Sequence, residues 1–305
     1  MDTSRIQAIF ERYTSGYHFF LRDLRSGEAV ELGTRRAWPI GSCFKLAVLV
    51  AYFEAVADGS LSPDNLDQET LIPPEKFRIG GGVINLLDSA IRLTDRHMLH
   101  LMIATSDGTS TDMLVGKIGL ARVDATLRRF APDSHLACNL GDMVAAFRTI
   151  PESVDCKTRR WGAGEADKFI DNVASLGATN AVDLANLALG AFEHEEQGCR
   201  VSMQRPRSPQ RTEMFIQPAL NVSTKSGSLG LRYFTQDCGV ISLQGDNQPL
   251  ATFGYCSCGM RLPAMVSDVA MGMVGVEIAK ALGLTEIVNS DWTPEGAALL
   301  LGDLP

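Results

Sequence analysis

The sequence predicts an α/β protein in which an antiparallel sheet is assembled from both ends of the chain, flanked by helices and interrupted by an all-helical domain. Alternating apolar and polar residues, which are typical of strands, occupy residues 17–32 and 219–257. Most of the chain between them shows the 3.6-residue apolar period of helices. We therefore expect a discontinuous sheet domain from residues 1–43 and 205–305, and a helical domain from residues 44–204.

The N-terminal elements follow from local patterns. A first helix, which Gly16 ends, is predicted by apolar residues at helical spacing: Ile6, Ile9, Phe10 and Tyr13. Residues 17–24 and 28–32 predict two strands joined by a hairpin turn over 25–27. Residues 44–57 are almost wholly apolar, which is too long for a strand and too short for a membrane span, so we expect a buried helix.

Three helices are expected in the middle of the chain. Thr94-Asp95 is typical of a helix N-terminus. A second helix covers residues 109–118 until Gly119, and a third covers residues 180–192. Residues 150–178 show weak periodicity, so we expect a long loop with one short helix there. Loops of this length in compact domains are often functional.

The C-terminal part predicts an antiparallel meander followed by a helix. Three strand-like segments share an alternating pattern: residues 219–225, 231–243 and 249–257. Gly245-Asp246-Asn247 is a turn between the last two. Ser267-Asp268 predicts the cap of a last helix that runs through Ala281.

The composition excludes several classes of protein. With 305 residues, 45% hydrophobic and 21% charged, the chain is neither disordered nor a disulfide-rich miniprotein. Its net charge of -8 argues against nucleic-acid binding, because no basic field is present to displace counterions from phosphates. No run approaches the ~20 apolar residues of a membrane span, so we expect no membrane partner.

The cysteines and the N-terminus bear on localisation. The 7 cysteines are scattered without zinc-site spacing, and Cys256 and Cys258 would share one face of a strand, which is poor disulfide geometry. The first residues do not resemble a secretory signal. We expect a cytoplasmic protein with reduced thiols, or a periplasmic or secreted one if a leader precedes this sequence in nature.

Ser42 and Lys45 are the first candidates for chemistry. They stand at i and i+3 at the entrance of the buried helix, so the hydroxyl and the amine can meet on one face. Serine is a nucleophile only when a base takes its proton, and lysine can be that base if burial depresses its pKa. Alone the pattern is weak, since a helix cap beside a solvated lysine explains it equally well.

Two further motifs favour the catalytic interpretation. Ser106-Asp107-Gly108 lies between two predicted helices, and Lys225-Ser226-Gly227 lies near the end of a predicted strand. The order Ser-x-x-Lys, Ser-Asp-Asn, Lys-Thr-Gly is the motif set of class A β-lactamases and penicillin-binding proteins. The sequence resembles this family of penicillin-recognising serine hydrolases, most closely its class A-like branch, which implies a β-lactamase/transpeptidase-like fold. Further similar segments lie within residues 17–120 and 179–285: 39–46, 54–61, 80–83 and 102–112.

The resemblance implies roles for the matched residues. Ser42 would be the nucleophile that becomes acylated, and Lys45 would activate it. Ser106 would relay a proton to the leaving nitrogen, while Lys225 would bind a substrate carboxylate and hold Ser106 in place.

The resemblance also implies a substrate site around the third motif. Ser226 and Gly227 would contact the substrate. Ser226 would form a hydrogen bond with the carboxylate of the substrate. The backbone N–H groups of Ser42 and Ser228 would form the oxyanion hole. Arg232 is a candidate second cation for the carboxylate, with a solvated hairpin residue as an equal alternative. The expected partner is a small molecule that carries a carboxylate; no cofactor and no metal is implied.

Three departures from the family stand out. Gly108 occupies the substrate-contacting position where the family has Asn. Ser226 replaces the Thr of the family, and this change keeps the hydroxyl group. The class A motif E-x-x-L-N, which supplies the glutamate for deacylation, is not found, and the interval from Ser106 to Thr179 is longer than expected. Glu165 is the best candidate for that base, although a surface carboxylate is the simpler interpretation.

Two other sites are set aside. His97 and His100 have metal-compatible i, i+3 spacing, but no third ligand is evident, so no metal site is expected. Cys43 adjoins the nucleophile and should point away from it as a small packed residue.

The leading functional hypothesis is a serine hydrolase that forms an acyl-enzyme at Ser42 and hydrolyses a β-lactam or related amide, a reaction associated with antibiotic resistance. One alternative is a cytoplasmic β-lactamase-like esterase, amidase or biosynthetic acyl-transfer enzyme, which Gly108 and the missing motif favour. An alternative of another class is a non-hydrolysing β-lactam-binding or sensor protein. The sequence does not indicate the oligomeric state.

Overall fold

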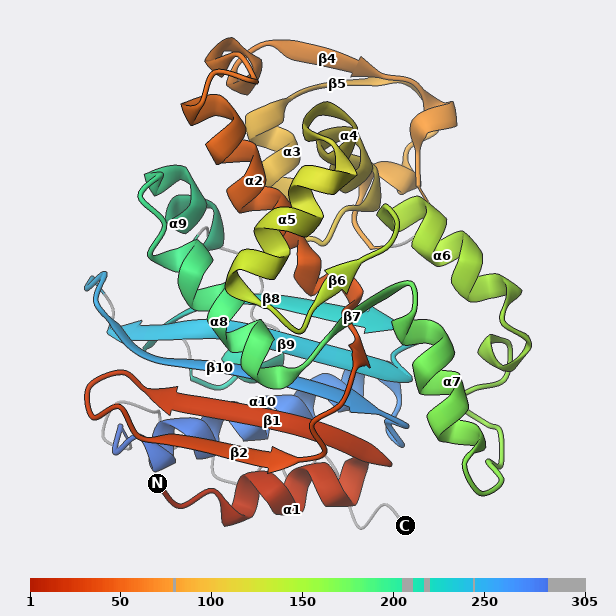
Figure 1. Cartoon of the computed structure of the whole chain (residues 1–305), viewed down its shortest axis with the longest axis vertical. Helices are drawn as coiled ribbons and strands as arrows, with labels where there is room; N and C mark the ends of the chain where they lie inside the picture. The colour runs from red at the N-terminus through yellow and green to blue at the C-terminus, as the bar shows by residue number, and fades with distance from the viewer. Residues whose placement is uncertain (79–80, 205–210, 217–219, 244, 285–305) are drawn as a thin grey trace.

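A computed structural model describes residues 1–78, 81–204, 211–216, 220–243 and 245–284 (Figure 1). The predicted fold class is confirmed: the chain forms an antiparallel sheet with helices on both faces and a largely helical part above it. Two expected features, Gly80 of the glycine turn and the first residue of the 219–225 strand, lie outside the described residues.

The central sheet joins the two ends of the chain. Its five strands have the order β2-β1-β10-β9-β8, and β1 pairs with β10 so that Phe19 faces Tyr255. The bounds are β1(Gly16–Asp23), β2(Ala29–Gly33), β8(Leu220–Leu229), β9(Phe234–Leu243) and β10(Pro249–Cys258). Two smaller sheets accompany it, one with the strand order β3-β7-β6 and one that pairs β4 with β5. The bounds of these strands are β3(Trp38–Pro39), β4(Glu69–Ile72), β5(Ile91–Thr94), β6(His135–Leu136) and β7(Gly177–Thr179).

Helices cover both faces of this sheet. Figure 1 shows α8 in front of the sheet and α1 with α10 on the other side. The α-helices are α1(Ser4–Tyr13), α2(Lys45–Ala57), α3(Asp95–Ala104), α4(Gly108–Ile118), α5(Leu120–Phe130), α6(Leu140–Thr149), α7(Glu165–Ala174), α8(Ala181–Phe192), α9(Gln197–Met203) and α10(Ala264–Ala281). The two larger hydrophobic clusters lie on opposite faces, one around α2 and α8 and one around α1 and α10.

Two predicted boundaries near the third motif are wrong. Strand β8 extends to Leu229, and β9 begins only at Phe234 because Gly230, Leu231 and Arg232 have φ angles of 59°, 50° and 68°, which end the strand. Two of these three residues are not glycine, so the sequence does not indicate that they adopt left-handed φ angles.

The last helix also starts earlier than predicted. Its N-cap is Pro263, so Ser267 and Asp268 lie inside the first turns instead of capping it. The N–H of Ser267 donates to the carbonyl of Pro263, and the Asp268 carboxylate is free to pair with side chains near the site.

One residue just before α2 is partly exposed to solvent. It follows the 3-10 helix η1(Gly41–Phe44), and between Trp38 and Tyr52 every residue except Ser42 is buried. The predicted buried helix is therefore confirmed, and η1, which leads into it, carries Ser42 at the boundary between core and solvent.

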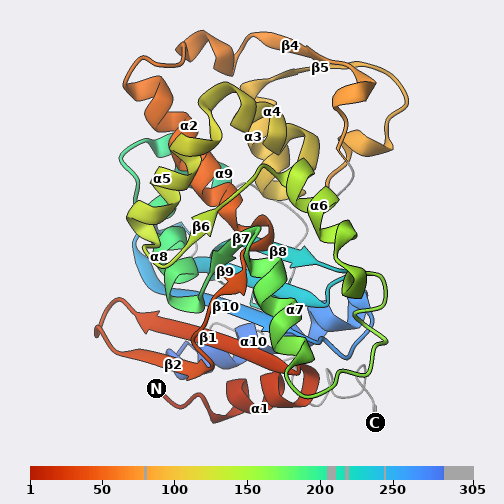
Figure 2. The same cartoon turned by 45° about the vertical axis from the view of Figure 1, so that its right-hand side comes forward.

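The segment expected as a long loop contains more regular structure than predicted. It holds η5(Pro151–Ser153) and the 10-residue helix α7, after α6 at its start. Figure 2 brings α6 and α7 forward at one end of the sheet. Aromatic rings pack this segment onto the start of β9: Phe147, Trp161, Phe169, Tyr233 and Phe234. Arg36 fixes α7 further by ion pairs with Asp167 and Asp171.

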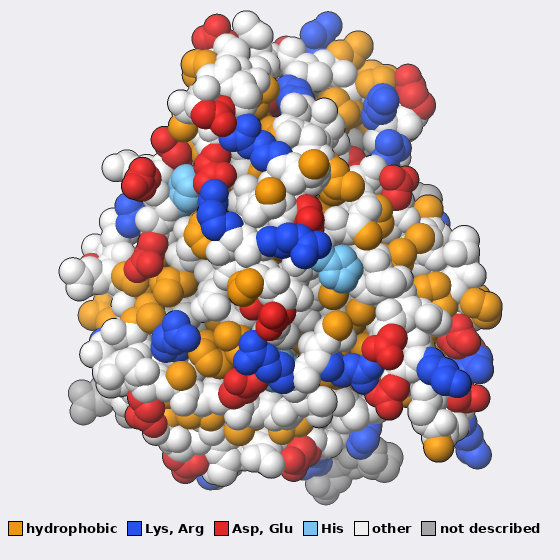
Figure 3. All heavy atoms as spheres, viewed as in Figure 1, with side chains coloured by type: hydrophobic (Ala, Val, Ile, Leu, Met, Phe, Trp, Pro, Cys, Tyr) orange, Lys and Arg blue, Asp and Glu red, His pale blue; other side chains and the backbone are white. Residues whose placement is uncertain are grey.

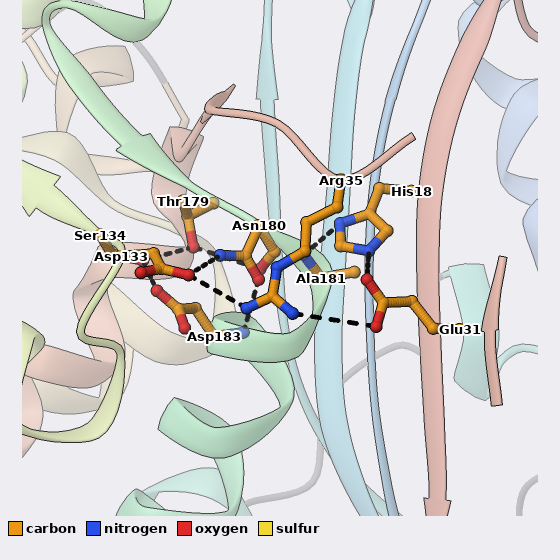
Figure 4. Close-up of polar contacts among 9 residues, drawn as sticks. All are labelled: His18, Glu31, Arg35, Asp133, Ser134, Thr179, Asn180, Ala181 and Asp183. Atoms are coloured by element: carbon orange, nitrogen blue, oxygen red, sulfur yellow. Dashed lines mark hydrogen bonds and ion pairs between the residues drawn. The ribbon is translucent and has the colours of Figure 1, made fainter. Parts of the chain in front are cut away.

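A buried polar cluster joins the N-terminal strands to α8 (Figure 4). His18 is fully buried; its Nδ1 accepts from the N–H of Ala181 at 3.0 Å, and its Nε2 contacts Glu31 at 2.8 Å. Because Nδ1 is an acceptor, the proton lies on Nε2 and the ring is neutral. Burial lowers the pKa of His18 and outweighs the opposing effect of Glu31.

This cluster predicts a loss of stability in mild acid. The pKa of His18 is lower in the folded than in the unfolded chain, so unfolding takes up a proton and the free energy of unfolding falls as pH drops below about 6.5. We expect His18→Gln, which can keep both hydrogen bonds, to flatten this dependence in urea unfolding between pH 7 and 5. His135→Gln, at a partly exposed position, is the control. An unchanged slope in His18→Gln would contradict the assignment.

Within the part of the chain that the structure describes, no helix is both long enough and apolar enough to span a membrane. The described residues also contain no cluster of three or more metal-ligating side chains. His97 instead takes part in the capping of α3, where its Nδ1 accepts from the N–H of Thr94.

Candidate active site

The structure brings together Lys45, Ser106 and Lys225 from the three sequence motifs. The Lys45 amine donates to Ser106 Oγ at 2.9 Å and to the Ser106 carbonyl at 2.6 Å. The Lys225 amine lies 3.2 Å from the same Oγ. One serine hydroxyl is therefore held between two lysines that come from α2 and β8, far apart in the sequence.

The lysines of the three motifs are buried, and the serines are partly exposed. Lys45 and Lys225 are 0% and 1% exposed, whereas Ser42, Ser106 and Ser226 are partly exposed. The hydroxyls thus face the solvent side, and the amines lie beneath them. Ser42 Oγ has no hydrogen-bond partner among the described residues, which is common for nucleophiles before substrate binds.

The environment of Lys45 suits a base. Burial lowers its pKa well below the ordinary value, and the nearby Lys225 cation lowers it further. The carboxylates of Asp107 and Asp112 act in the opposite direction but do not outweigh these effects. A buried amine with a depressed pKa can be neutral near pH 7 and accept a proton from serine.

Ser106 is held in an unusual backbone conformation. Its φ of 59° is in the left-handed region, which costs a non-glycine residue about 1–2 kcal/mol. Asp107 stabilises this turn: Oδ1 accepts from Ser110 N at 2.8 Å, and Oδ2 accepts from Val83 N and Ile84 N at 2.9 and 3.0 Å. Asp107 therefore holds Ser106 at the start of α4.

Two glycines allow η1 to lie against β8. A Cβ atom at Gly227 would lie 2.8 Å from Ser42 N, and one at Gly41 would lie 3.2 Å from Ser228 N. The segments that carry the two expected oxyanion-hole donors, Ser42 and Ser228, are thus in direct backbone contact. The hydrogen-bond donors of such a hole must be fixed before the reaction, and this packing fixes them.

Gln236 lies directly behind these glycines. It is fully buried on β9 opposite Gly227, and neither atom of its side-chain amide has a hydrogen-bond partner among the described residues. A Cβ atom at Gly41, whose φ is 52°, would lie 2.5 Å from Gln236 Oε1. Gln236 thus fills the space that any side chain at position 41 would need.

This contact predicts a rescue pattern. Gly41→Ala should lower the rate of Ser42 acylation by about tenfold or more, because the new methyl group displaces either Gln236 or the start of η1. Adding Gln236→Ala should recover part of the rate, since it opens the space, while the backbone strain at φ 52° remains. Burst kinetics on the two single variants and the double variant measure the coupling. Strictly additive losses would show that the two side chains do not share this space.

Arg211 is a residue that sequence reasoning missed. It is 4% exposed, and its Nη1 donates to the Gly227 carbonyl at 2.6 Å and to the Gln236 carbonyl. Its Nε lies 3.4 Å from Asp268, which also pairs with Arg232 Nη1 at 2.6 Å. Arg211 thus supports the third motif from behind, and no motif in the sequence marks it.

The predicted second cation, Arg232, lies just beyond the same strand. Its side chain is 28% exposed, and the shared Asp268 compensates part of its charge. The structure therefore places it near the third motif but already paired.

A family model described as a beta-lactamase enzyme family matches residues 3–255. The chain belongs to the beta-lactamase enzyme family. No curated protein matches it in a sequence search. Family and fold together make it a β-lactamase-like serine hydrolase.

Solved structures show the same fold. A beta-lactamase from Sphaerobacter thermophilus has a TM-score of 0.72 at 18% identity, covering 93% of this chain and 99% of that one. An ancestral class A beta-lactamase, from the last common ancestor of Gram-negative bacteria, has a TM-score of 0.71 at 16% identity, with 92% and 99% covered. The structure of PBP-A has a TM-score of 0.68 at 17% identity, with 92% and 95% covered.

The first departure from the family, Gly108, lies at a closely packed position. Gly108 begins α4, and a Cβ atom there would lie 3.3 Å from Leu140 Cδ2 and 3.5 Å from Arg78 Cβ. The Cβ atom of an asparagine would therefore be in tight contact with Leu140 and in ordinary contact with Arg78, so the position is closely packed but does not exclude a side chain. This β-lactamase-like enzyme must recognise its substrate without an amide at that position.

The third departure concerns the deacylating base. Glu165 is exposed at the start of α7, and its carboxylate accepts from Gly162 N at 2.9 Å. Among the described residues, no contact joins it to Ser42 or Lys45. Four other carboxylates near this segment bind other side chains: Asp142 binds Asn139, Asp155 binds Arg159, and Asp167 and Asp171 bind Arg36.

The start of α6 is fixed next to the second motif by Asp112, another residue that sequence reasoning missed. Its carboxylate accepts from the N–H groups of Leu140 and Gly141, both at 2.9 Å. Burial raises the pKa of Asp112 despite these contacts. The helix α6, which lies in the long interval between Ser106 and Thr179, therefore begins close to the second motif.

Cys43 lies where the sequence predicts. It is fully buried, and its thiol contacts the carbonyl of Lys225 at 3.2 Å, so it packs η1 onto β8. All of the cysteines are free, including Cys256 and Cys258 on β10.

Proposed function

We propose that the chain forms an acyl-enzyme at Ser42 with a small carboxylate-bearing β-lactam or related amide or ester. The observation that carries this proposal is the Lys45–Ser106–Lys225 cluster with buried amines. Lys45 takes the proton of Ser42, and the oxygen attacks the carbonyl. Ser106, bridged to both lysines, returns a proton to the leaving group. Lys225 and Ser226 attract the substrate carboxylate.

A second candidate is slow or absent turnover after acylation. It is favoured by the position of Glu165, which is exposed and bonded to Gly162. In this version the protein acts as a β-lactam-binding protein or as an acyl-transfer enzyme whose acceptor is not water. A variant of PBP-A was solved as an acyl-enzyme complex with penicillin G, which shows that this fold can hold such an adduct.

Parallel kinetics with a chromogenic cephalosporin and p-nitrophenyl acetate distinguish these candidates. Continuous hydrolysis of the cephalosporin supports a β-lactam hydrolase. A stoichiometric burst without turnover supports the second candidate, and turnover of the ester alone supports an esterase. Ser42→Ala is the control, and a rate that survives in Ser42→Ala would contradict the proposal.

A further inference from the structure

A buried side-chain amide lies behind the two expected oxyanion-hole donors. Charged side chains are spread over the surface of the protein, as Figure 3 shows for one face. Gln236 is instead 0% exposed, and neither its Oε1 nor its Nε2 has a hydrogen-bond partner among the described residues. Unpaired polar atoms in a protein interior lower stability and are rare, so they are often associated with a functional role.

The amide lies in the angle between η1 and β8. Gln236 stands opposite Gly227 in the pairing of β8 with β9. Its Oε1 is 2.5 Å from the position that a Cβ atom would take at Gly41, and 3.0 Å from the corresponding position at Gly227. These two positions are in turn 3.2 Å from Ser228 N and 2.8 Å from Ser42 N. The end of the amide is therefore close to both donor nitrogens.

The backbone of Gln236 is fixed, whereas its amide group is not. The carbonyl of Gln236 accepts from Arg211 Nη1, which also donates to the carbonyl of Gly227 at 2.6 Å. No hydrogen bond among the described residues determines which end of the amide faces the donors. Oε1 and Nε2 can therefore exchange places by rotation about the last side-chain bond. A charge that develops nearby selects one of the two orientations, because a buried dipole is poorly screened.

We propose that Gln236 is a positioning residue for the oxyanion hole, and that its amide turns the Nε2 end toward the hole as negative charge develops there. The inference rests on the proposed acyl-enzyme at Ser42. When Ser42 Oγ bonds to the substrate carbonyl carbon, the π electron pair of the carbonyl moves to its oxygen. The N–H groups of Ser42 and Ser228 would bind this oxygen. The positive end of the amide behind these groups stabilises the charge further.

Gln236→Met tests the role of the amide, because methionine has a similar length and volume without polar hydrogen-bonding groups. We expect acylation of Ser42 by p-nitrophenyl acetate to be about tenfold slower, a smaller loss than for a donor that touches the oxyanion. The midpoint of thermal unfolding should rise, since the change removes an unpaired buried amide. Gln7→Met, the same change at an exposed position on α1, should keep the parent acylation rate.

A thiono ester gives a measurement that is specific to the hole. The sulfur of p-nitrophenyl thionoacetate accepts hydrogen bonds weakly, so the parent protein should prefer the oxygen ester, each rate being divided by the rate in buffer. This preference should shrink in Gln236→Met.

A folded Gln236→Met variant with the parent rate, or a slower one with an unchanged preference for the oxygen ester, would overturn the inference. A lower midpoint of unfolding, or failure to fold, would also overturn it, because the resting amide would then be hydrogen-bonded. No Ser42-dependent burst of the parent protein with any ester and no adduct with any β-lactam would overturn the proposed function, and the inference with it.

Discussion

Lys45→Met will slow acylation of Ser42 by a factor of about 10²–10⁴. The amine of Lys45 is fully buried, has a lowered pKa and donates to Ser106 Oγ at 2.9 Å, which supports its proposed role as the base for Ser42. Methionine fills a similar volume without a titratable group, and removal of a buried amine should leave the fold intact. Stopped-flow bursts with p-nitrophenyl acetate measure the rate.

The control for this change is Lys76→Met, at an exposed lysine in the 3-10 helix Pro74–Lys76. It should acylate at the parent rate. Thermal unfolding of both variants separates a lost base from a lost fold. If Lys45→Met is folded and acylates as fast as the parent, Lys45 is not the base.

Gly227→Ala will have the second large effect. The added Cβ atom would lie 2.8 Å from Ser42 N and 3.2 Å from Cys43 N, which are backbone atoms that cannot rotate away. The 3-10 helix η1 must therefore move off β8, which would separate the two expected oxyanion-hole donors. We expect acylation to fall by about 10²-fold or more, and the free energy of unfolding by about 1–3 kcal/mol.

Gly116→Ala provides the matched control. Gly116 lies on α4, and a Cβ atom there meets nothing within 4 Å, so this change should leave acylation unchanged. The carbonyl stretch of the acyl-enzyme gives an independent measure, because weaker oxyanion donors raise its frequency. A folded Gly227→Ala variant with the parent rate and stretch would contradict the assigned geometry.

Much of the fold could be predicted because it depends on short-range patterns. Apolar spacing gave α1 and α2, and Thr94 caps α3 as its residue type suggests. The errors fall where the cause is long-range. Leu231 and Arg232 adopt left-handed backbone angles, which their residue types do not predict, and these angles end β8. The N-cap of α10 is Pro263, although Ser267 has the residue type that is more common at an N-cap.

The candidate site shows the same division. Ser42, Lys45, Ser106 and Lys225 carry motifs, and the structure joins the last three by hydrogen bonds. Arg211 carries no motif, because its role is to bond two carbonyls of neighbouring strands that only folding brings together.

The same holds for the glycines and for Gln236. Gly227 is required by the backbone of Ser42 and Cys43, which only folding places against it. The position of the Gln236 amide depends on how η1 meets β8, which no short-range pattern predicts.

Peptide mass mapping after acylation tests the central claim most directly. The protein is incubated separately with penicillin G and p-nitrophenyl acetate, quenched in acid and cleaved with trypsin. Cleavage after Arg36 and Lys45 gives a peptide of residues 37–45, with Ser42 as its single serine and Cys43 beside it. We predict an adduct on this peptide with at least one reagent, retained in Cys43→Ala and lost in Ser42→Ala. No adduct on this peptide, or one that survives Ser42→Ala, would contradict the account.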